Sequence, residues 1–259
     1  MKMVLWLALA MGMAGLAPAA SLVAVDAYGG SNNNGSSNGD VIGLLRSFDI
    51  DLVSISNTGN NVTVIVHMNY GASGGDTSLS PITFSGFPNV NPGDVLLTNG
   101  SNRWAIPLIS HNNSAPGAGG MTAANLYSVS SFLTATTVLG IPPSGNYRPN
   151  ENVWGNSTGA TVRSSGASRN VTLFAAPYEI EVAINFTLLT DVANAANTTA
   201  FLNALSDSGS VLHFAAATCG NDVVNGSPTA DETTPEPASL ALMGAGLVGL
   251  GFWGRKRLA

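Results

Sequence analysis

Three aspartates, Asp26, Asp40 and Asp222, lie beside glycine- and asparagine-rich segments that suit calcium binding. Calcium takes hard oxygen ligands, which carboxylates, amides and backbone carbonyls supply from flexible loops. If the first and last strands of the fold are neighbours, these three carboxylates can meet, and we predict a calcium site there. Asp49 and Asp51 are further candidate ligands. The alternative is that each aspartate caps the backbone of its own turn.

A second group of carboxylates, Glu179 and Glu181, alternates with apolar residues in an extended segment. Alternate residues of a strand share one face and lie about 7 Å apart, which is within the range that glycoside hydrolases use. A solvated sheet face explains the pair more simply, and His67 on the polar face of another predicted strand has the same interpretation. We therefore predict no catalytic residue.

The known catalytic and cofactor motifs are absent or misplaced. The sequence holds no H-E-x-x-H, C-x-x-C or Walker loop. Residues 71–75 fit G-x-S-x-G, but a nucleophile elbow needs a strand, a turn and then a helix, and a β segment is expected next. Residues 244–249 spell G-x-G-x-x-G without a preceding strand or a following acidic residue, so a dinucleotide site is excluded.

Two aromatic residues, Tyr147 and Trp154, are the candidates for a ligand site. They flank Arg148 within a segment rich in proline, glycine, asparagine and serine. Aromatic rings offer a large apolar face that can stack on a sugar ring. The alternative is that these rings pack in the core or anchor the loop.

Charge excludes nucleic acid as a partner. Only 9% of the residues are charged, the formal net charge is −6, and both lysines, Lys2 and Lys256, lie in terminal segments. Phosphate backbones require clustered lysine and arginine. Cys219 is the only cysteine, so no intrachain disulfide forms and the stability must come from the core.

The elements that must position these residues are strands. Apolar and polar residues alternate along 62–70 and 178–188, which predicts strands with one buried face. Within 48–56 the alternation changes face after Leu52, which predicts a β-bulge. About eight or nine strands separated by turn residues predict an all-β fold. Residues 20–228 are expected to form a single antiparallel, jelly-roll-like β-sandwich with one short helix over 198–207.

Both ends of the chain carry apolar segments. Residues 1–19 combine one lysine, an apolar run and an A-x-A site, which predicts a secretory signal peptide and makes signal peptidase a partner. Residues 229–237 read as a linker and 238–254 as a transmembrane helix of about 25 Å. Residues 255–259 form a basic tail, which the positive-inside bias keeps in the cytoplasm.

At the C-terminus, Pro235, Glu236 and Pro237 precede the apolar segment, and Arg255, Lys256 and Arg257 follow it. This order of residues resembles the PEP-CTERM sorting signal of Gram-negative bacteria. The resemblance implies processing by a membrane-embedded exosortase and transient anchoring in the inner membrane. Release or transfer to the cell surface or an exopolysaccharide matrix would follow. A tail anchor without processing is the alternative.

These patterns predict an exported surface or matrix protein with a structural or binding role and with polysaccharide as the candidate partner. Two alternatives stay open. One is a secreted hydrolase acting on polysaccharide or peptide, and the other is a self-assembling matrix subunit. Calcium is the one cofactor considered.

Overall fold

The computed structural model describes residues 21–26, 31–32, 41–42, 45–84, 87–117, 119–140 and 148–227. The chain divides into two compact units, Met1–Thr229 and Ala230–Ala259, and all described strands lie in the first. The predicted signal peptide, linker, transmembrane helix and basic tail lie outside the described residues. Within the described ranges, no helix is long and apolar enough to span a bilayer.

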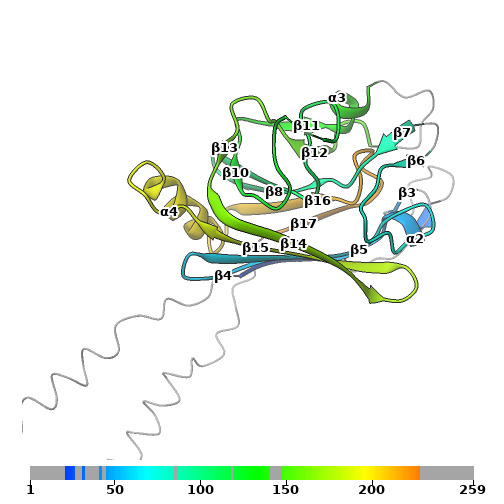
Figure 1. Cartoon of the computed structure of the whole chain (residues 1–259), viewed down its shortest axis with the longest axis horizontal. Coiled ribbons are helices and arrows are strands. Elements are labelled where there is room, and N and C mark those ends of the chain that lie inside the picture. Colours follow the sequence, from blue (N-terminus) through cyan, green and yellow to red (C-terminus); the bar gives the residue numbers. More distant parts are fainter. Residues whose placement is uncertain are drawn as a thin grey trace, which may run out of the picture. The chain divides into compact units, whose positions relative to one another are not determined.

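The first large sheet has five antiparallel strands (Figure 1). In spatial order these are β1 (Ser21–Val25), β4 (Ile50–Thr58), β5 (Asn61–Asn69), β15 (Glu179–Leu188) and β14 (Ser164–Ala175). Burial alternates residue by residue along β5 and along most of β15, as the period of two in the sequence predicts. One face of this sheet is therefore apolar and covered.

The second large sheet has six strands and faces the first. In spatial order these are β13 (Thr161–Val162), β10 (Tyr127–Ser128), β9 (Asn102–Pro107), β8 (Asp94–Asn99), β16 (Ser210–Ala215) and β17 (Val223–Gly226). All of its described pairings are antiparallel. The prediction of an all-β, antiparallel fold is therefore confirmed, while the jelly-roll description stays a prediction.

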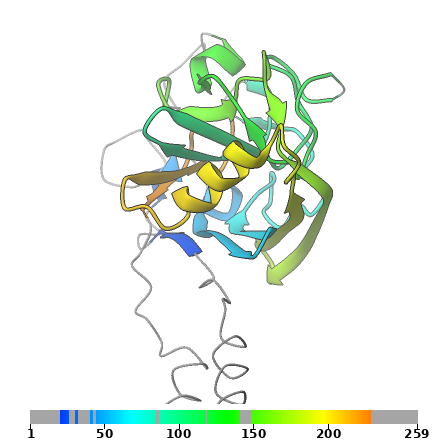
Figure 2. The same cartoon turned by 90° about the vertical axis from the view of Figure 1, so that its left-hand side faces the viewer.

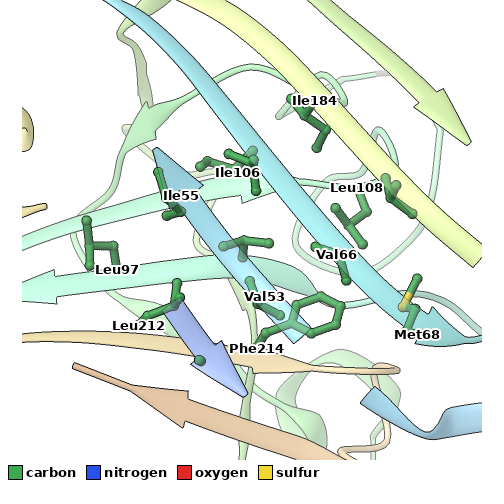
Figure 3. Packing of buried hydrophobic residues seen from close by; sticks show 14 of the residues in the cluster. Val53, Ile55, Val66, Met68, Leu97, Ile106, Leu108, Ile184, Leu212 and Phe214 are labelled. Carbon is green, nitrogen blue, oxygen red and sulfur yellow. The ribbon is translucent and has the colours of Figure 1, made fainter. Parts of the chain in front are cut away.

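One apolar core joins the two sheets. It contains Val64 and Ile184 from the first sheet together with Val95 and Phe214 from the second, and Figure 3 shows side chains of both sheets interdigitating. Burial of this surface is the main stabilising contribution, which is consistent with Cys219 being free and buried. Since all core residues among the described ranges lie in the unit that ends at Thr229, we expect that unit to fold alone.

Smaller elements complete the fold. They are the strand pairs β2–β3 (Ser31–Asn32, Val41–Ile42), β6–β7 (Ile82–Phe84, Phe87–Val90) and β11–β12 (Phe132–Thr134, Asn152–Gly155), and the helices α2 (Leu45–Phe48), α3 (Ala135–Leu139) and α4 (Ala195–Ala204). Helix α4 covers one end of the sandwich (Figure 2), where Phe201 packs edge-on against Trp104.

The predicted short helix exists but begins earlier than residue 198. The backbone N–H groups of Asn194 and Ala195 both donate to the backbone carbonyl of Asp191, and the Asp191 carboxylate also accepts from Asn194. These bonds form the first turn and start α4 at Ala195. Helices α2 and α3 were not predicted because each is about one turn long, too short to show a helical period.

The sandwich closes differently on its two sides. On one side β1 and β17 approach so closely that a Cβ atom on Gly226 would lie 2.5 Å from the Cβ of Ala24. On the other side β13 and β14 are nearly continuous, and the chain passes from one sheet to the other at Arg163. The Arg163 guanidinium donates to Ser128 and to Asn194, which holds this corner.

Candidate functional site

The candidate site lies on the outer face of the five-stranded sheet, beside the turn that joins β14 to β15. A surface depression of about 260 Å³ is found there. Its lining consists of Asp49, Asp51, Asn69 and the segment from Ala175 to Glu179. His67 and Glu181 adjoin this lining through Glu179. Carboxylates therefore dominate this part of the surface.

The β-bulge predicted in this strand is confirmed, and it supplies one of these carboxylates. The register between β4 and β5 shifts between Ile50 and Leu52, so Asp51 is the extra residue. A bulged residue is turned away from the regular alternation. Asp51 is exposed as a result, and its backbone carbonyl accepts a hydrogen bond from Asp26 at the end of β1.

His67 lies between two glutamates on the same sheet face. The pairing of β5 with β15 places Glu181 opposite His67 and Glu179 opposite Asn69. His67 Nε2 donates to Glu181 Oε2 at 2.9 Å, and Nδ1 lies 4.0 Å from Glu179 Oε1. The imidazole also stacks on the ring of Phe174, with centroids 3.9 Å apart. The histidine is thus held by both a hydrogen bond and a ring contact.

Glu179 titrates above its usual range. Partial burial is the largest cause that raises the pKa of its carboxyl group, and the nearby negative charge of Asp51 adds to it. His67 acts in the opposite direction, while a hydrogen bond with Asp51 again raises the pKa. Functional sites often contain a carboxyl group whose pKa is raised by a second carboxyl group. Clusters of charged residues with a purely structural role also show such raised pKa values.

The rim of the depression is apolar and exposed. Phe174 and Tyr178 are 54% and 42% exposed. The turn contains a cis peptide bond before Pro177 and packs against the neighbouring loop, where Gly75 N donates to Tyr178 O at 2.7 Å. A Cβ atom on Gly75 would lie 2.7 Å from Pro177 O, so the contact requires a glycine.

That loop contains the segment 71–75 with the pattern G-x-S-x-G. It follows β5 and leads to β6, with no helix between them. A nucleophile elbow requires a helix directly after the turn. The exclusion of a serine hydrolase on this motif therefore agrees with the observed order of elements.

The predicted calcium ligands are only partly described. The first and last strands, β1 and β17, contact each other, as the calcium prediction requires. Asp222 is fully buried, and its two oxygens accept hydrogen bonds from the backbone N–H groups of Ile50 (2.7 Å) and Val223 (2.8 Å). Asp40 lies outside the described residues.

No group of three or more His, Cys, Asp or Glu residues arranged to hold a metal occurs among the residues that the structure describes. The calcium site at Asp26, Asp40 and Asp222 therefore stays a prediction. Melting the protein with calcium and then with a chelator tests it, and an unchanged midpoint would remove the reason to keep the site.

The predicted aromatic pair is not seen together. Tyr147 lies outside the described residues, and Trp154 is 1% exposed. The Trp154 indole donates to Pro92 O at 3.0 Å and stacks on His111, with ring centroids 4.0 Å apart. A ring in this position is covered by protein, which favours the core-packing alternative for Trp154.

His111 and Asp94 form a second polar cluster that is closed to solvent. Both side chains are fully buried, and His111 Nε2 donates to Asp94 at 3.0 Å while Nδ1 donates to Asn112 O at 2.9 Å. Burial alone would lower the pKa of His111, but the Asp94 carboxylate and these hydrogen bonds raise it above the usual value. This pair is structural, because no ligand reaches it.

Sequence reasoning placed His67, Glu179 and Glu181 on polar strand faces but did not bring them together. The signal in the sequence is the alternation within each strand, and it carries no information on which strands pair. His67 and Glu181 are 114 residues apart in the chain. Asp51 lies in the segment 48–56 that was predicted to contain a bulge, but its proximity to Glu179 requires the three-dimensional fold.

Comparison with known proteins identifies one segment. The family model described as the PEP-CTERM protein-sorting motif matches residues 233–256. This range includes Pro235, Glu236, Pro237, Arg255 and Lys256 and ends one residue before Arg257, so the predicted resemblance is confirmed. No curated protein and no solved structure matches the chain.

Proposed function

Because the chain carries a PEP-CTERM sorting signal, we propose that it is an exported, exosortase-processed protein with a structural or binding role at the cell surface or in the extracellular matrix. The observation that carries this proposal is the match over residues 233–256. The apolar run and A-x-A site within residues 1–19 support it, since secretion requires an N-terminal signal.

We further propose that the depression beside the β14–β15 turn binds polysaccharide. Carboxylates and amides accept or donate hydrogen bonds to hydroxyl groups, and Glu179, Glu181 and Asn69 supply them on one face. The exposed rings of Phe174 and Tyr178 provide apolar surfaces for sugar rings. The excess of carboxylates favours neutral or cationic sugars over anionic ones.

A glycan array probed with purified residues 20–229 tests the binding role. The proposal expects binding to one class of neutral or amino sugar. Phe174→Ala should weaken it about three- to tenfold, the value of one aromatic contact, and Glu181→Gln should weaken it as well. Val211→Ala removes an apolar side chain that is 47% exposed on β16 in the other sheet and serves as the matched control. Binding that is equally strong in all variants would contradict the proposed position of the site.

The second candidate is a hydrolase, and it is favoured by one observation, the raised pKa of Glu179 beside Asp51. General acid catalysis uses a carboxyl group whose pKa is raised and that lies near a second carboxyl group. Release of reducing ends from the bound polysaccharide would support this candidate, provided that Glu179→Gln lowers the rate of release far more than it weakens binding. Absence of product from a glycan that binds would leave the binding role alone.

A further inference from the structure

Strand β14 presents a long open edge. It is twelve residues long, nine of them are exposed, and its only described neighbour in the sheet is β15. In the part of the chain that the structure describes, no strand lies on its other side. Such an edge offers backbone N–H and C=O groups for pairing with another strand. Figure 1 shows the β14–β15 hairpin at the margin of the sheet.

The other outer strands of the two large sheets offer much less unpaired backbone for a new strand. β1 and β17 lie against each other at Ala24 and Gly226, and β13 is two residues long. The open edge of the described sandwich is therefore concentrated in β14.

β14 lacks several of the residues that commonly protect an edge. It contains no lysine, no proline and no carboxylate, and its register with β15 is irregular only near its two ends, between Ser165 and Ser168 and between Leu173 and Ala175. Natural edge strands commonly use such residues to prevent pairing with other chains. Its one charged residue is Arg169, whose guanidinium donates to the backbone carbonyl of Leu108. The guanidinium is therefore bound within its own chain, and the open edge of β14 is nearly neutral.

We propose that two copies of this chain associate by antiparallel pairing of their β14 strands, which joins two five-stranded sheets into one. The proposal rests on the sandwich alone and does not depend on the glycan site. A pairing centred on Asn170 places Leu173 of one copy opposite Ala167 of the other, and Phe174 opposite Gly166. Large exposed side chains at one end of the strand thus meet small residues at the other end, which makes the strand complementary to itself.

Charge favours a second copy as the occupant of this edge. The folded part of the chain is acidic, so most surfaces of two copies repel each other, but β14 carries no carboxylate. The nearest glutamate in register, Glu181, is on β15. The Glu181 residues of two copies would be at least three strand spacings apart, about 14 Å, which exceeds the screening length of about 10 Å in 0.1 M salt.

Sedimentation velocity over a range of concentrations tests the proposal on purified residues 20–229. A reversible monomer–dimer equilibrium is expected without any glycan. Asn170→Lys places like charges opposite each other at the two-fold axis and should weaken the dimer at least tenfold. The control is Thr58→Lys, which adds the same charge at an exposed end of β4 in the same sheet and should leave the equilibrium unchanged. A protein that stays monomeric at its highest soluble concentration would overturn the proposal.

Cysteine cross-linking tests the register. Native Cys219 does not interfere, because it is fully buried and burial raises the pKa of its thiol. Asn170→Cys should form a disulfide-linked dimer under mild oxidation, since opposed residues of antiparallel strands lie within disulfide range. Thr58→Cys should not. Equal cross-linking of the two variants, or a dimer that Asn170→Lys leaves intact, would show that β14 is not the interface. Either result would leave the glycan proposal untouched.

Discussion

His111 and Asp94 form the most completely buried ion pair among the described residues, and both ring nitrogens of His111 face acceptors. An imidazole between a carboxylate and a carbonyl carries both protons, because each nitrogen must donate. Asp94 also accepts from Gly155 N at 2.8 Å, so the pair connects β8, the His111 loop and β12. This network holds the three segments together without a disulfide, which a single cysteine cannot form.

Removing one partner of this pair should therefore lower the free energy of unfolding strongly. His111→Gln leaves the Asp94 charge buried without its cation, and we expect a loss of about 3–5 kcal/mol in the free energy of unfolding. Urea unfolding followed by circular dichroism measures it. His67→Gln, at a histidine on the outer sheet face, is the control and should cost less than about 1 kcal/mol. Equal losses for the two variants would contradict the role given to the buried pair.

The same pair should make stability depend on pH. The folded-state pKa of His111 is raised, so its contribution is complete below the unfolded value of about 6.5. It is then lost as the pH rises through the folded-state pKa, by up to about 1.4 kcal/mol per pH unit. Unfolding free energies between about pH 6 and pH 9 should fall in the native protein. They should fall less steeply in His111→Gln, and parallel slopes for the two proteins would exclude this linkage.

At the scale of the residue, the sequence indicates on which face of a strand a side chain lies, but not which residues it contacts. The alternation around His67 and around Glu181 was sufficient to place both on polar faces. Their contact depends on the pairing of β5 with β15, which is set by packing of the whole core. His111 and Asp94 gave no signal, because neither lies in a recognisable motif and their burial results from the loops that cover them.

At the scale of the element, strands with regular alternation were predicted well. A bulge was predicted from a change of face after Leu52, and the register shifts just before that residue, between Ile50 and Leu52. The start of α4 was missed because it depends on hydrogen bonds to Asp191 that no apolar pattern records. Helix α3 depends on Thr134, whose side chain accepts from Thr137 N, and on Gly140 at its end. Such short helices are determined by their caps and not by periodicity.

The contact between β1 and β17 gives a prediction at this scale. In Gly226→Ala the new Cβ would lie 2.5 Å from the Cβ and 2.8 Å from the Cα of Ala24, so the two strands must separate. We expect a loss of about 1–3 kcal/mol in unfolding free energy, as for other overpacked cores. Gly209→Ala is the matched control, since its Cβ would meet only the Asp207 carboxylate, at 3.3 Å. A melting temperature lowered no more by Gly226→Ala than by the control would refute the close approach.

At the scale of the whole molecule, composition and alternation were sufficient to predict an antiparallel all-β fold within the middle of the chain. The order of strands in the two sheets was not predictable, since it depends on long-range pairings such as β5 with β15 and β8 with β16. The sorting signal was predictable from a short segment, because it consists of a local motif, an apolar run and basic residues in a fixed order.

Export and exosortase processing are the central claim, and mass spectrometry of both termini of the protein from its native cells tests it most directly. We predict a mature chain that begins near Ala20 and lacks the apolar segment and basic end of the sorting signal, recovered from the cell surface or the medium. Recovery of the intact chain from Met1 to Ala259 in the cytoplasm would contradict the account.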